Sequence, residues 1–60
     1  SIAHSAAERA VRQNTVVRLR PMVAGERRAV HMALRDNTDV FTESEGQEPN
    51  RLVVIKPNRR

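Results

Sequence analysis

The fold of this chain is decided by residues 40–57, which read VFTESEGQEPNRLVVIKP. Within this stretch, residues 52–55 form an apolar run, β-branched from Val53 to Ile55, that is typical of a strand, and Pro57 ends it. Residues 40–44 place every second side chain on one face, which predicts another strand. The connection 45–50 contains a glycine and a proline and favours a turn. Because a connection this short joins antiparallel strands, we expect a hairpin.

Two amphipathic helices and one further strand are expected ahead of the hairpin. Residues 1–13 and 22–36 follow the helical period, and residues 15–20 alternate like a half-exposed strand that ends at Pro21. The apolar stripe of the first helix is Ile2, Ala3, Ala6, Ala7, Ala10 and Val11, and that of the second is Val23, Val30, Ala33 and Leu34. The order α-β-α-β-β predicts an α+β fold in which two helices cover one face of a three-stranded sheet.

Composition limits the classes of function. Sixty residues fit one domain with a small core, and the absence of cysteine excludes disulfides and thiolate metal sites. No apolar run approaches the roughly 20 residues that cross a bilayer, and the chain does not begin like a signal peptide. We therefore expect a cytoplasmic protein without membrane insertion. Because the sequence lacks an initiator methionine, we also expect it to be a domain cut from a longer protein.

The charge balance points to an anionic partner. Eleven Lys and Arg against seven Asp and Glu give a net charge of +4, and ten of the eleven basic residues are arginine. The guanidinium group is forked and weakly hydrated, which suits phosphate recognition. Residues 9–35 carry seven of the arginines, whereas residues 36–48 carry five acids and no basic residue. We therefore expect two opposed electrostatic faces.

The second predicted helix carries a ridge of three cationic or titratable side chains, Arg27, His31 and Arg35. Their spacing of four residues stacks them along one side of the helix. No acid lies within this Arg/His ridge, so a phosphate backbone is the first partner to consider. Arg28 borders the ridge. Arg28 and Arg35 contribute positive field more than specific bonds, or belong to an ordinary solvated face.

Each of these residues also has a structural interpretation. Arg27 can pair with a carboxylate and orient the turn at 46–50; the available partners are Glu26, Glu45 and Glu48. His31 can then hydrogen-bond the backbone where the helix meets the sheet. Arg51, at the start of the last strand, either reaches the same groove as Arg27, which we favour, or forms a salt bridge with Glu48.

Catalysis and cofactor binding have little support in the sequence. His4 and His31 lie on different predicted helices, and no spacing resembles a metal site. The two glycines cannot form a phosphate-binding loop. We expect no enzyme, no cofactor, no metal and no small-molecule substrate.

Phe41 is the only aromatic residue, and core or edge packing of its ring is favoured over base stacking. Nucleic-acid binding should therefore depend on phosphate contacts and on salt concentration.

The spacing Arg27-x-x-x-His31 resembles the signature of the R-3-H domain, which is named for an arginine and a histidine separated by three residues. Residues 21–36, PMVAGERRAVHMALRD, together with residues 40–57 resemble the C-terminal domain of the bacterial Jag (SpoIIIJ-associated) family. The resemblance implies a small α+β domain that binds single-stranded nucleic acid, RNA more than DNA, with Arg27 and His31 as the contact pair. It also implies an upstream KH domain, with which this domain can be in contact. Gly25 departs from the family, which often has an aromatic residue there.

A protein-interaction module is the rival hypothesis. In one form an acidic partner docks on the Arg/His ridge. In the other, a neighbouring domain covers an apolar outer face of the sheet, for which the candidate residues are Val16, Leu52, Val54 and Phe41.

Overall fold

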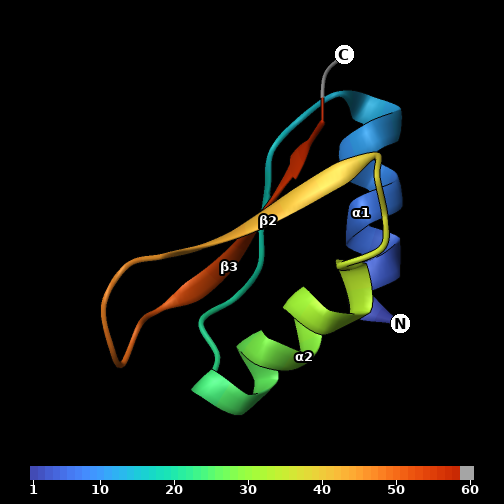
Figure 1. The fold of residues 1–60 in the computed structure, drawn as a ribbon. Coiled ribbons are helices and arrows are strands. Elements are labelled where there is room, and N and C mark those ends of the chain that lie inside the picture. Colours follow the sequence, from blue (N-terminus) through green and yellow to red (C-terminus); the bar gives the residue numbers. More distant parts are fainter. Residues whose placement is uncertain (59–60) are drawn as a thin grey trace.

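The computed structural model describes residues 1–58, which form two helices and a three-stranded antiparallel sheet (Figure 1). The elements in chain order are α1 (Ile2–Gln13), β1 (Val17–Arg18), α2 (Ala24–Leu34), β2 (Val40–Glu45) and β3 (Leu52–Pro57). This order confirms the α+β fold predicted from the sequence. Neither helix of the described part is long and apolar enough to span a membrane.

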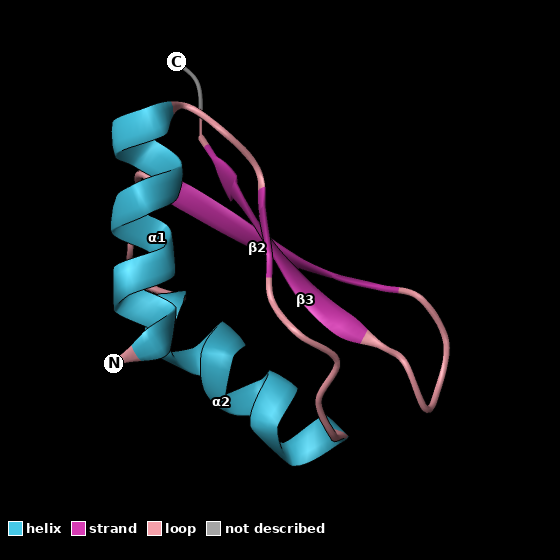
Figure 2. Ribbon diagram, turned by 180° about the vertical axis from the view of Figure 1, so that it is seen from behind, coloured by secondary structure: helices cyan, strands magenta, loops and turns pink. Residues whose placement is uncertain are grey.

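Strand β3 lies in the middle of the sheet, with β1 and β2 antiparallel to it on either side. The β2–β3 hairpin is paired along its whole length, from Val40 opposite Pro57 to Glu45 opposite Leu52. Figures 1 and 2 show both helices on the same side of the sheet, with the hairpin turn extending away from α1 on the side of α2. The turn and α2 therefore share one end of the molecule.

Strand β1 is shorter than the predicted range 15–20, since only two residues pair with β3 in a regular ladder. The chain beyond it still follows β3. The backbone N–H of Leu19 donates to the carbonyl of Val53 at 3.0 Å, and that of Met22 donates to the carbonyl of Arg51 at 3.1 Å. These hydrogen bonds hold residues 19–22, which lead into α2, against β3 and the residue that precedes it.

The core lies between the inner face of the sheet and the helices. It consists of Ala3, Ala6, Ala7, Ala10, Val17, Leu34, Val40, Val53 and Ile55. The alanine stripe of α1 is buried as predicted, and its small side chains let the helix approach β3 closely. The prediction is wrong at the two ends of that stripe, because Ile2 is 70% exposed and Val11 is 44% exposed. Both lie outside the contact with the sheet.

Helix α2 begins later and ends earlier than the predicted range 22–36. Val23 is its N-cap residue, with extended backbone and no side-chain cap, and its side chain is exposed. Ala33 is exposed as well, so of the predicted apolar stripe only Leu34 is buried and Val30 is half-buried. Since so little of this helix is covered, most of its surface is available to a partner.

The outer face of the sheet is not the apolar surface predicted from the sequence. Val54, at its centre, is only 2% exposed and lies between Arg18 and Glu43 on the neighbouring strands. Two ion pairs cross this face, Arg18 Nε to Glu45 at 3.1 Å and Lys56 Nζ to Glu43 at 2.6 Å. Side chains of both signs thus cover the valine, and this face is neither apolar nor purely acidic.

Phe41 lies on the outer face of the sheet, where the sequence placed it as a candidate. It is 44% exposed and has the Lys56 ammonium 5.9 Å from the centre of its ring. Of the two predicted alternatives, core packing is wrong, whereas Phe41 does lie on a strand at the edge of the sheet. Its ring stacks with a cation on the face opposite the helices.

Candidate nucleic-acid interface

Arg27 extends from the first half of α2 into the seam between the helix and the hairpin turn. Its Nη1 donates to the backbone carbonyl of Met22 at 2.7 Å, and its Nη2 lies 2.7 Å from Oε1 of Glu48. The residue is 8% exposed, which makes it the one buried charged residue among those described. The guanidinium therefore joins three segments, namely α2, the connection that precedes it, and the turn.

This geometry decides between the carboxylates that the sequence offered to Arg27. Glu48 is the partner, whereas Glu26 and Glu45 do not contact this guanidinium. A buried charge needs a partner, because desolvation of a lone cation costs far more than a hydrogen bond returns. The structural interpretation of Arg27 is thus confirmed, and the prediction that it contacts a phosphate stays a prediction.

His31 lies one turn further along α2 and faces strand β2. Its Nδ1 is 2.6 Å from the hydroxyl of Thr42, and its Nε2 is 3.1 Å from the hydroxyl of Ser44. The ring is half-buried. Because a hydroxyl can donate or accept, these two partners satisfy either tautomer of the neutral ring and also the imidazolium. The expected backbone hydrogen bond is replaced by this pair of side chains.

Thr42 and Ser44 were not among the predicted site residues. A signal for them is present in the sequence, since both occupy inward positions of a strand whose other inward residue, Val40, is buried. Two hydroxyls on the covered face of a strand require hydrogen-bond partners. A histidine on the helix that covers them is a suitable partner.

The other three predicted site residues are less tightly held. Arg28 is exposed and makes no salt bridge with a described residue, and Arg35 is exposed with Nε 3.8 Å from Asp36. Arg51 is half-buried and donates from Nη1 to the carbonyl of Gly46 at 2.7 Å. Its predicted alternative, a salt bridge with Glu48, is wrong for the described part of the chain, because that carboxylate pairs with Arg27.

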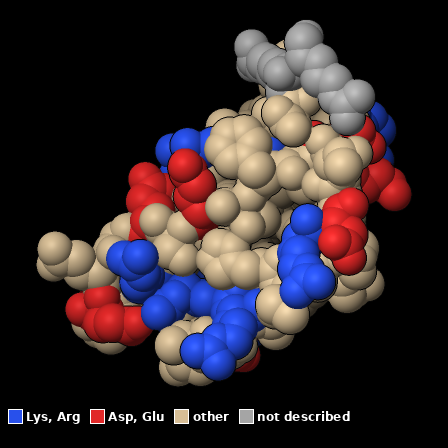
Figure 3. Space-filling model, in the orientation of Figure 1, with Lys and Arg blue, Asp and Glu red and all other residues tan. Residues whose placement is uncertain are grey.

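Figure 3 shows how the charged side chains are distributed on one face of the molecule. Lys and Arg side chains gather over α2 and the adjoining end of the hairpin, with acidic side chains at the margins of this basic band. Of the five predicted site residues, Arg27, Arg28 and His31 lie in α2, Arg35 is its C-cap residue, and Arg51 immediately precedes β3. The structure thus brings them to one end of the molecule, with two arginines open to solvent and Arg27 at the base of the seam.

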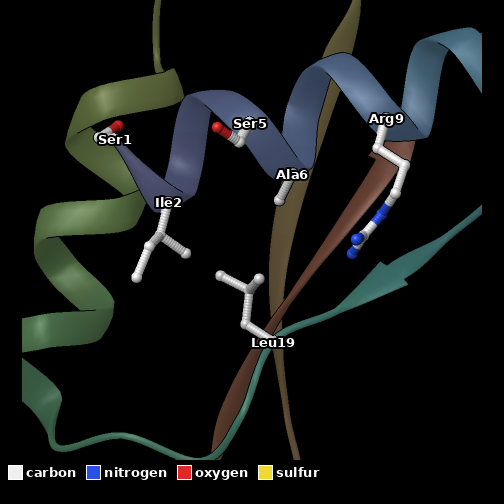
Figure 4. A pocket seen from close by; sticks show the side chains of 6 residues that line it. All are labelled: Ser1, Ile2, Ser5, Ala6, Arg9 and Leu19. Atoms are coloured by element: carbon white, nitrogen blue, oxygen red, sulfur yellow. The ribbon is translucent and has the colours of Figure 1, made fainter.

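Two pockets on the described surface gather fewer basic side chains than the basic band. The one in Figure 4 measures about 350 Å³ and is lined by Ser1, Ile2, Ser5, Ala6, Arg9 and Leu19. A larger one of about 530 Å³ lies between β1 and α2 and has mainly apolar walls that include Met22 and Val30. Within residues 1–58, no three His, Asp or Glu side chains gather as a metal site would require.

Comparison with known proteins gives a consistent result. A family model described as the R-3-H domain matches residues 1–57. The RNA-binding protein KhpB of Clostridium symbiosum is 40% identical over 63 aligned positions, which cover 100% of this chain and 28% of that protein. The protein of the same name from Lactiplantibacillus plantarum is 39% identical over 54 positions, which cover 90% of this chain and 17% of that protein. The chain therefore spans less than a third of either relative, and the resemblance drawn from residues 21–57 is confirmed.

Proposed function

The chain belongs to the R-3-H domain family, and from this premise we propose that it binds single-stranded nucleic acid, RNA in preference to DNA, through phosphate contacts. The names of the two similar proteins, both RNA-binding, support the proposal. The proposed contact residues are Arg27, His31, Arg28, Arg35 and Arg51. The observation that carries the proposal is the basic band over α2 and the end of the hairpin.

The roles of these residues differ because their surroundings differ. Arg28 and Arg35 are exposed and can meet phosphate oxygens without giving up a close partner. Arg51 keeps one internal hydrogen bond and can offer its remaining donors. Both ring nitrogens of His31 are bonded to hydroxyls, so a phosphate contact from His31 would exchange Thr42 or Ser44 for a phosphate oxygen. Since the lone aromatic ring lies on the outer face, no stacking platform accompanies the basic band within the described residues. Binding should therefore be largely independent of base sequence.

A salt titration tests the proposal. We expect fluorescence anisotropy with a labelled single strand to give a plot of log affinity against log salt with a slope near −2, which corresponds to about three neutralised phosphates. An increase from 50 to 200 mM salt would then weaken binding about 16-fold. Single-stranded RNA should bind more tightly than single-stranded DNA of the same sequence, and both more tightly than duplex.

Single substitutions test whether the nucleic acid binds at the basic band. Arg28→Ala and Arg35→Ala remove exposed side chains, so each should lower the magnitude of the slope by about 0.7 without loss of folding. His31→Ala should weaken binding by about 1–2 kcal/mol. Arg9→Ala, on α1, makes the same charge change away from the band and is the control. Equal effects of the control and of Arg28→Ala would contradict the assignment.

The rival hypothesis, a protein-interaction module, has lost part of its basis. At the centre of the outer face, on which a neighbouring domain would sit, Val54 is buried and two ion pairs cross the surface. The other form, an acidic partner on the ridge, predicts negligible affinity for every single strand in the titration above. For the whole protein we propose, on the Jag resemblance, an upstream KH domain and a cytoplasmic location.

A further inference from the structure

The Arg27–Glu48 contact has the geometry that a phosphate contact would have. A carboxylate oxygen lies 2.7 Å from Nη2 of the guanidinium. Carboxylate and phosphate oxygens accept the same short, charge-assisted bonds from arginine. The carboxylate of Glu48 thus stands where an anionic ligand of Arg27 would place an oxygen atom.

The two partners differ sharply in exposure. The side chain of Arg27 is 10% exposed, whereas that of Glu48 is 61% exposed. Arg27 is also held from behind by the carbonyl of Met22 at 2.7 Å. The cation is therefore fixed at the base of the seam, and the carboxylate covers it from the solvent side.

The turn that carries Glu48 has supports of its own. Arg51 Nη1 donates to the carbonyl of Gly46 at 2.7 Å, and the backbone N–H of Asn50 donates to the carbonyl of Gln47 at 2.8 Å. These bonds do not involve the Glu48 side chain. That side chain can consequently leave Arg27 by rotating into water while the turn keeps its shape.

We propose that Glu48 occupies the position of one nucleic-acid phosphate in the free domain, and that the phosphate displaces it when a strand binds. This inference rests on the proposed function and concerns the same site. The exchange leaves the buried guanidinium paired in both states, which avoids the large cost of an uncompensated charge. Glu48 therefore weakens binding and stabilises the free fold.

A solely structural role of Glu48 predicts a different pattern. If the carboxylate only anchored the turn, its loss would lower stability and would leave affinity unchanged or reduced. Under displacement, its loss lowers stability but raises affinity. The opposite signs of the two effects separate the interpretations.

Glu48→Gln is the decisive variant, because it removes the charge and keeps the size. Glu45→Gln is the matched control. It makes the same charge change at the end of β2, but the ion-pair partner of Glu45 is Arg18 on the outer face.

The probe is a fluorescein-labelled twelve-nucleotide poly-uridine RNA, and binding is followed by anisotropy at low salt. We expect Glu48→Gln to bind about fivefold more tightly, the scale of an ion pair with an exposed partner, and to have a lower melting temperature. The control should change affinity less than twofold.

The outcomes are distinguishable. If the unaltered chain binds RNA and folded Glu48→Gln binds with equal or lower affinity, or if the control gains as much, the displacement is wrong and the proposed function stands. If no form of the chain binds the RNA, both the displacement and the proposed function are wrong.

Should Glu48→Gln not fold, an NMR titration of the unaltered chain with RNA tests the displacement instead. The carboxyl carbon resonance of Glu48 should move during an RNA titration, while that of Glu45 stays in place. A Glu48 resonance that does not move overturns the displacement.

Discussion

Arg27 connects the helix, the preceding segment and the hairpin turn through a single planar group. The bond to Met22 fixes one edge of the guanidinium, and the bond to Glu48 fixes another. Lysine cannot reproduce this arrangement, because its ammonium lacks the forked donors. Arg27, which we propose as a phosphate contact, is therefore also a structural residue, and loss of binding in an Arg27 variant must be read together with its stability.

We expect Arg27→Ala to lower the free energy of unfolding by about 1–3 kcal/mol, since it leaves a partly buried carbonyl and a carboxylate without their donor. Because Glu48 is largely exposed, we expect the loss of unfolding free energy to lie toward the lower end of this range. Urea denaturation followed by circular dichroism measures it. Arg28→Ala removes an exposed neighbour and should change the same quantity by less than about 0.5 kcal/mol. Similar values for the two variants would show that the seam contributes little.

Of the two helices, α2 is the less well supported. It begins without a side-chain cap at Val23, and Gly25 lies in its first turn. A Cβ atom added at Gly25 would meet nothing within 4 Å apart from its chain neighbours and the adjoining backbone of its own helix. Glycine there costs backbone entropy on folding and gains no close contact in return.

Gly25→Ala should therefore raise the free energy of unfolding by about 0.5–1 kcal/mol. A urea or thermal melt checks this value, and RNA affinity should stay unchanged because no charge is altered. Gly46→Ala is the contrasting variant. Gly46 has φ of +85°, and a Cβ atom there would lie 3.1 Å from the carbonyl oxygen of Asn50, so that variant should be destabilised. Stabilisation by both changes, or by neither, would contradict the argument.

The elements and their order were predictable because each has a local signal. The alanine stripe of residues 3–10 and the apolar run at 52–55 both appear at the expected places. The short β1 and the covered Val54 were not predictable, because both depend on which strand lies beside β3 and in what register. The same holds for the site. The sequence supplied Arg27, His31 and three carboxylates, but the turn conformation selects Glu48 among them.

At the scale of the whole molecule, charge and stability are largely separate. The core is made of aliphatic side chains between the helices and the inner face of the sheet. Ion pairs between exposed side chains lie outside it, such as Arg12 with Glu8 at 3.1 Å on α1 and Arg18 with Glu45 at 3.1 Å. Pairs of this kind usually contribute less than about 1 kcal/mol each and are screened by salt.

Salt should consequently affect binding far more than folding. Between 50 and 500 mM salt we expect the free energy of unfolding to change by less than about 1 kcal/mol, while affinity for a single strand falls about 100-fold for a slope of −2. Thermal melts and anisotropy in the same buffers provide the comparison. A parallel loss of both quantities would show that the fold itself depends on its surface charges.

The central position of β3 has a consequence for the order of folding events. The last element of the domain lies between the other two strands, so that Val17, from the first third of the domain, pairs with Ile55. The earlier strands cannot join each other directly, and the inner face on which both helices rest is incomplete without this one. During synthesis on a ribosome, the helices would emerge before the surface that receives them. Collapse into the native topology must therefore wait for the final strand, since it brings the long-range contacts whose loop-closure entropy limits the rate.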